Sequence, residues 1–145
     1  MNHELVRSLC WHDTSAITEV EEKCKKALKW VRKVNKEPAT DMTKIDELCR
    51  LCLEVSMAWA LAEKRWKEIH PEYVFDEEES IYDHWVTQLW KFARENSIDQ
   101  KDNLTVQGSP LMVEYYLEEL AKSMKQIREE MGKDLGILEE AFEES

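Results

Sequence analysis

The chain has 145 residues, of which 43% are hydrophobic and 35% charged, so it is the size of one domain with a single core. Only 3 Gly and 3 Pro are present, and this scarcity of turn-forming residues predicts an all-α fold, a single-domain antiparallel bundle of about four main helices. No apolar run approaches the roughly 20 residues that span a bilayer. We therefore expect a cytoplasmic protein that does not enter a membrane.

Residues 1–15 form an N-terminal segment, and the first long helix is expected over 16–35, before Pro38. Its apolar residues recur at alternating intervals of three and four, as on one face of a helix: Ile17, Val20, Cys24, Ala27, Val31 and Val34. Lysines and arginines surround Trp30 on the other faces, a combination that can bind phosphates and stack a base. Because the whole chain carries a net charge of -11, which repels a polyanion, we do not expect nucleic-acid binding.

The second helix is expected over 42–69, where His70 and Pro71 stop it. Its apolar stripe is the longest in the chain: Ile45, Leu48, Cys52, Val55, Trp59, Ala62, Trp66 and Ile69. Between 48 and 62 the other faces are also largely apolar, through residues such as Met57 and Leu61. This composition predicts that the second helix is the central element, with neighbours on all sides.

The third helix is expected over 77–95, with Asp76 as its N-cap and an acidic first turn that complements the helix dipole. Its apolar residues form two stripes, Ile81, Trp85, Leu89, Phe92 and Tyr82, Val86, Trp90, Ala93. A face this wide packs against two helices or against a partner. It leaves a symmetric homodimer open.

The fourth helix is expected over 110–142, after a polar loop and the cap formed by Ser109 and Pro110. Gly132 and Gly136 each destabilise a helix interior by about 1 kcal/mol relative to Ala. The pattern therefore leaves two alternatives for 132–145, a bent continuation of the helix or a separate acidic tail.

Cys49 and Cys52 have the spacing of a zinc half-site or a redox pair, and Cys10 with His12 would supply two further zinc ligands. A redox pair needs its nucleophile at a helix N-terminus, whereas Cys49 lies about two turns inside the second helix. Buried free cysteine is common in protein cores. We expect core packing for these thiols, with no metal ion and no cofactor.

Carboxylates on helices offer a second chemistry, a metal-dependent hydrolase of the all-α carboxylate type. The residues available for it are Glu19, Glu22, Glu47, Glu54, Asp83 and His84. No Glu-x-x-His sequence completes the pattern, and Glu19 and Glu22 lie in a first helical turn, where acids are favoured by the dipole.

The sequence favours a non-catalytic function. Residues 1–70 carry a net charge of +1 and residues 71–145 one of -12, so the second half offers an acidic surface to a partner with a basic one. We expect an acidic cytosolic protein that binds another protein, as an inhibitor, an immunity-type protein or an adaptor. The alternatives are the hydrolase and an acidic mimic of nucleic acid. The expected contact residues are Trp90, Tyr82, Glu77, Glu78, Glu79, Trp30, Tyr115 and Trp11.

Overall fold

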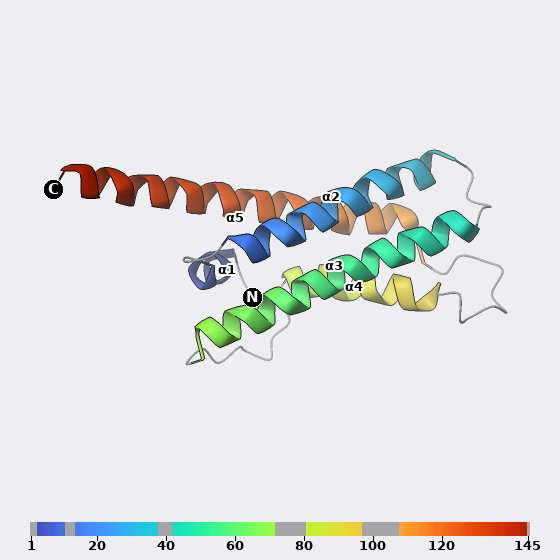
Figure 1. Cartoon of the computed structure of the whole chain (residues 1–145). Coiled ribbons are helices and arrows are strands. Elements are labelled where there is room, and N and C mark those ends of the chain that lie inside the picture. Colours follow the sequence, from blue (N-terminus) through green and yellow to red (C-terminus); the bar gives the residue numbers. More distant parts are fainter. Residues whose placement is uncertain (1–2, 11–13, 38–41, 72–80, 97–107, 145) are drawn as a thin grey trace.

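The computed structural model describes residues 3–10, 14–37, 42–71, 81–96 and 108–144, with side chains described over 6–133 of these ranges apart from residue 42. The five helices within them are α1 (His3–Leu9), α2 (Ser15–Lys36), α3 (Met42–Ile69), α4 (Ile81–Glu95) and α5 (Pro110–Glu144) (Figure 1). These ranges contain no strand, which confirms the predicted all-α class. None of the described helices combines the length and the apolar character that crossing a bilayer requires.

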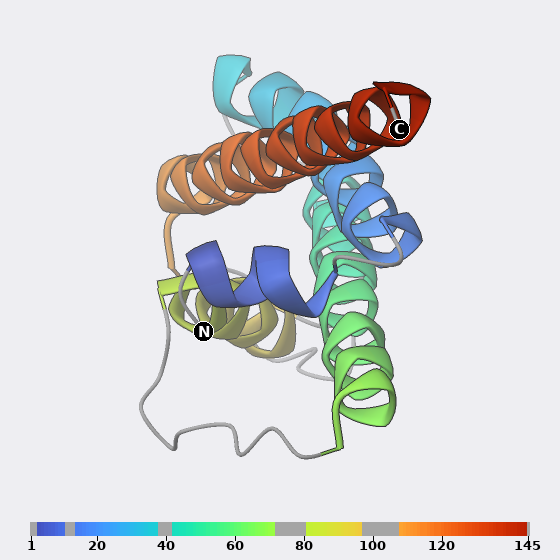
Figure 2. The same ribbon diagram turned by 90° about the vertical axis from the view of Figure 1, so that its left-hand side faces the viewer.

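The four long helices form an antiparallel bundle. Helix α2 packs against α3 and α5, helix α4 packs against the same two helices, and the short α1 lies on α5 (Figure 2). The direction is fixed by contacts far apart in sequence: Glu21 of α2 meets Arg128 of α5, while Asn35 near the end of α2 meets the carbonyl of Pro110. Trp30 of α2 meets Lys44 near the start of α3, and Figure 1 shows each long helix running opposite to both of its neighbours.

The core contains the predicted stripe of α2 in full, since every residue of that stripe is buried. On α3 the stripe is buried from Ile45 to Trp66, but Ile69 at its end is 40% exposed. Trp59 packs edge-on against Trp66, with ring centroids 5.5 Å apart, and also meets Tyr82 of α4 at 5.8 Å. Large aromatic rings thus fill the space where α3 and α4 meet.

The prediction that α3 is surrounded by neighbours is wrong. Met57 is 63% exposed and Leu61 64%, and Leu53 is also exposed. The wide apolar face is instead covered on α4, because α4 packs against both α3 and α5 and buries members of both its stripes. Part of the exposed apolar surface of the described residues therefore lies on α3, in Leu53, Met57 and Leu61.

Two helix ends bear on the predictions. Helix α4 is described from Ile81 onward, and the start expected at residue 77, together with the acidic run, lies outside the described residues. Helix α5 continues through Gly132 and Gly136 to Glu144 without ending, and extends beyond the first turn of α2 (Figure 1). At its other end the Ser109 hydroxyl accepts a hydrogen bond from the Met112 amide at 3.4 Å, as expected of an N-cap.

Candidate partner-binding site

A groove of about 920 Å³ runs between the first half of α2 and the second half of α3. Ala58 and Ala62 are almost fully buried at its bottom, while the long side chains of Met57 and Leu61 stand exposed beside them. Alanines at the bottom and larger residues at the side make a depression with an apolar lining. The charged side chains that line it are Glu19 and Lys23 on α2, and Glu54, Lys64, Arg65 and Glu68 on α3.

The sequence places apolar side chains here because α3 has more of them than its neighbours can cover. Trp59 and Trp66 occupy the core side of α3, and Met57 and Leu61, four residues apart, lie next to each other on the outer side. Ile69 extends the apolar lining to the end of α3. The groove is therefore a consequence of a helix that is apolar on more than one face.

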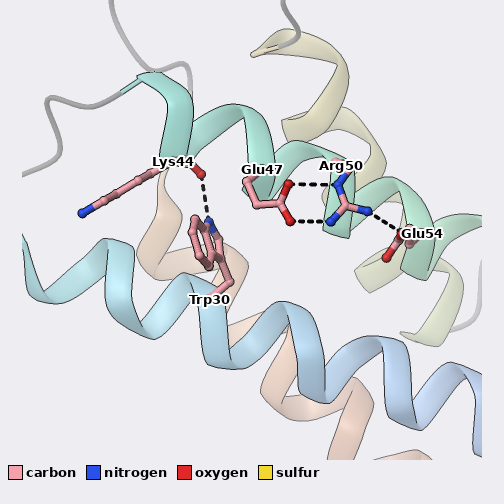
Figure 3. Close-up of polar contacts among 5 residues, drawn as sticks. All are labelled: Trp30, Lys44, Glu47, Arg50 and Glu54. Atoms are coloured by element: carbon pink, nitrogen blue, oxygen red, sulfur yellow. Dashed lines mark hydrogen bonds and ion pairs between the residues drawn. The ribbon is translucent and has the colours of Figure 1, made fainter.

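A row of ion pairs holds the carboxylate of Glu54 at one end of the groove. The guanidinium of Arg50 donates from Nε to Oε2 of Glu47 at 2.9 Å and from Nη1 to Oε1 of Glu54 at 2.7 Å (Figure 3). These bonds orient both carboxylates along one face of α3, and the bond from Arg50 lowers the pKa of Glu47. The second oxygen of Glu54, Oε2, is buried and has no hydrogen-bond partner among the described residues.

Trp30 has a structural task between α2 and α3. Its indole Nε1 donates to the carbonyl of Lys44 at 2.9 Å, and the side chain is half-buried (Figure 3). Tyr82, another expected contact residue, is only 3% exposed and belongs to the aromatic core. Burial removes Tyr82 from the surface that a partner can reach, because its ring fills the α3–α4 interface.

Trp90 and Tyr115 are exposed, by 43% and 49%, and lie on different helices, α4 and α5. Asp83 of α4 faces α3, because its carboxylate accepts a hydrogen bond from the indole of Trp59. Trp90 follows Asp83 by seven residues, about two helical turns, and so lies on the same side of α4. The guanidinium of Arg94 stacks over the ring of Trp90, 5.1 Å from its centroid. The expected contact residues Trp11, Glu77, Glu78 and Glu79 lie outside the described residues.

All four cysteines are buried thiols. Burial raises the pKa of the Cys24 and Cys52 thiols, and raises that of Cys49 to about 12. The Cys49 thiol also lies 3.7 Å from the carbonyl oxygen of Asn96, to which it donates. Because the thiolate is the form that attacks disulfides and binds metal, these thiols fill space in the core. His12, the fourth member of the zinc pattern, lies outside the described residues.

The acidic residues considered for a hydrolase are paired with basic neighbours or apart from one another. Glu47 and Glu54 both bind Arg50, Glu19 lies 3.8 Å from Lys23, and His84 packs edge-on against the ring of Tyr116. Within the described ranges, no group of three or more His, Cys, Asp or Glu residues is placed to hold a metal ion.

One acidic pair was not anticipated from the sequence. Glu63 of α3 meets Asp83 of α4, whose Oδ1 accepts the indole N–H of Trp59 at 2.9 Å. Burial first, and then the neighbouring Asp83 carboxyl, raise the pKa of Glu63 to about 7. The pair crosses the α3–α4 interface, so only the fold brings the two acids together.

Comparisons of the chain with models of known protein families, with characterised proteins and with solved structures found no match. Any assignment of function therefore has to come from the chemistry of the surface. The α2–α3 groove and the exposed Met57 and Leu61 are its most distinctive feature among the described residues.

Proposed function

We propose that this chain is a non-catalytic protein that acts by binding another protein chain in the groove between α2 and α3. The observation that supports it best is the pair Met57 and Leu61, two large apolar side chains almost two-thirds exposed beside an alanine-lined depression. Contiguous exposed apolar surface with a polar rim is typical of interaction sites. Covering both side chains contributes on the order of 2 kcal/mol to binding.

The shape of the groove suits an amphipathic helix as the bound element. A helix laid in the depression would set its apolar face against Ala58, Ala62 and Leu61 and its polar flanks against the rims. The rims carry both signs of charge, for example Lys23 and Glu19 on α2, so the partner's flanks need both signs too. A protein that mimics nucleic acid would bind its partner through a surface of negative charge alone. The mixed charges beside this groove do not favour that function. An inhibitor, an immunity-type protein or an adaptor fits a groove of this kind.

Affinity capture from native lysate tests the proposal with two matched double variants. Met57→Glu with Leu61→Glu places charge in the groove, while Leu111→Glu with Met112→Glu places the same charges on another exposed Leu and Met, at the start of α5. We expect the groove variant to lose the proteins that wild type captures, and the α5 variant to retain them. Thermal melts establish that both variants fold. The same captured proteins from the groove variant would show that the groove is not the binding site.

A further inference from the structure

The outward side of α3 carries a sequence that is self-complementary in charge. Reading from one end, it has a base, an acid, two apolar residues, a base and an acid, and reading from the other end each sign is inverted. The residues are Arg50, Glu54, Met57, Leu61, Arg65 and Glu68. Such a pattern pairs with a copy of itself when the copy runs in the opposite direction.

Helix geometry places these residues on one side of α3. Arg50 and Glu68 are 18 residues apart, which is five turns and about 27 Å, so they share a face. Met57 and Leu61 lie between them, each seven residues from the nearer charge. All four are exposed. The face therefore has an apolar middle and oppositely charged ends.

Glu54 and Arg65 lie on the α2 side of that face, where both line the groove. Both are offset from the centre of the face toward α2. In an antiparallel pair, Glu54 of one copy therefore lies opposite Arg65 of the partner subunit.

We propose that a second copy of this chain binds along the outward face of α3, at the edge of the groove, with the two α3 helices antiparallel about a two-fold axis at the level of Trp59. This rests on the proposed function and names the partner. Met57 packs against Leu61 of the partner subunit. Arg50 keeps its bonds to Glu47 and Glu54 of its own subunit and also faces Glu68 of the partner subunit. Glu54 meets Arg65 of the partner subunit. The two-fold axis repeats each contact.

The charges select this register over its neighbours. Sliding one copy by a turn in one direction sets Arg50 opposite Lys64 of the partner subunit. Sliding it a turn in the other direction sets Glu54 opposite Glu68 of the partner subunit. A parallel pair sets every charge opposite its own kind. Like charges in contact are unfavourable, so one antiparallel register remains.

The size of the contact sets the strength expected. The contact extends along about 27 Å of α3 and includes side chains beside the groove, so its buried area is at the small end for stable interfaces. We therefore expect a dimer that forms reversibly at micromolar concentrations. Analytical ultracentrifugation of the wild type between about 5 and about 500 µM covers that range. The mass is expected to rise from 17.2 kDa toward twice that value.

Charge-reversal variants test the register. Arg50→Glu alone and Glu68→Arg alone are each expected to weaken self-association at least tenfold, by placing like charges opposite each other. Mixing the two variants restores both ion pairs, and a heterodimer of wild-type affinity is expected. Met57→Glu with Leu61→Glu removes the dimer, whereas Lys125→Glu, an exposed charge reversal on α5, leaves it unchanged. Circular dichroism confirms that each variant is helical.

A wild type that stays monomeric to about 500 µM refutes the dimer, and so does a mixture of the two charge variants that fails to associate. A monomeric wild type that captures a foreign protein, with capture lost in the Met57→Glu, Leu61→Glu variant, overturns the dimer and leaves the proposed function standing. A monomer whose capture is unchanged in that variant overturns both.

Discussion

Replacing Arg128 of α5 with methionine is expected to destabilise the bundle, because Glu21 of α2 would lose its main partner inside the interface. Glu21 is 2% exposed, and its carboxylate accepts bonds from Nε and Nη2 of Arg128 at 2.7 and 3.2 Å. Nζ of Lys25 lies 2.9 Å from the same carboxylate. The bond from Arg128 is the largest cause that lowers the pKa of Glu21.

The size of the effect follows from which groups remain. Removing one partner of a fully buried ion pair costs about 3–5 kcal/mol. Arg128 is 39% exposed and Lys25 stays in place, so solvent and Lys25 reduce the loss, and we expect about 2 kcal/mol. In a cycle with Glu21→Gln, the coupling between the two positions should be about 1.5 kcal/mol.

Urea unfolding at pH 7, followed by tryptophan fluorescence, measures the free energy of unfolding for each member of the cycle. Because the pKa of Glu21 is lower in the folded state, its carboxylate stabilises the protein at pH values above the unfolded pKa of 4.5. This stabilisation is lost as the pH falls through the pKa of the folded state. The coupling should therefore shrink at pH 3. As a control, Arg32→Met breaks an exposed pair with Glu118 and should cost less than about 0.5 kcal/mol. A coupling that small between Glu21 and Arg128 would refute the reasoning.

Three further outcomes follow from the interior. The raised pKa of Glu63, about 7 against an unfolded value of 4.5, means that the folded state keeps a proton that the unfolded state has released, so stability falls between these pH values. The full shift corresponds to about 2.5 kcal/mol between pH 5 and pH 8, and because Glu63 is only partly buried, Glu63→Gln should flatten the fall in urea titrations by about 1 kcal/mol. Burial raises the pKa of Cys24, so a thiol reagent at pH 8 should label it only on unfolding, and fast labelling of the native chain would contradict its place in the core. Trp30→Phe removes the bond to Lys44 and should lower the unfolding free energy by about 1 kcal/mol, a loss that Trp90→Phe should not reproduce.

The spacing of apolar residues predicted helices and core faces well, because it records which side of a helix is turned inward. Val20 and Cys24 of α2 are buried as their spacing requires. The spacing could not decide which apolar faces have neighbours. Met57 and Val55 are both apolar residues of α3, yet one is 63% exposed and the other fully buried, because α2 and α4 cover only part of the helix.

The candidate site was harder to anticipate for the same reason. Tyr82 and Trp90 belong to one predicted stripe of α4, but the first fills the core and the second is 43% exposed. The pair Glu21 and Arg128 joins residues 107 positions apart, a distance at which no local pattern carries information. The sequence does show an excess of apolar residues on α3. That excess is equally consistent with a helix buried on all sides and with an exposed binding face, and only the positions of the neighbouring helices distinguish the two.

A photo-reactive amino acid at position 61, compared with one at position 111, tests most directly whether the outer face of α3 binds a protein chain. Leu61 and Leu111 are exposed to a similar extent, 64% and 67%, on different helices. Irradiation in native lysate should yield a protein adduct from position 61 and none from position 111, and an adduct of twice 17.2 kDa identifies a second copy. Adducts from position 111 alone, or from neither position, would contradict the account.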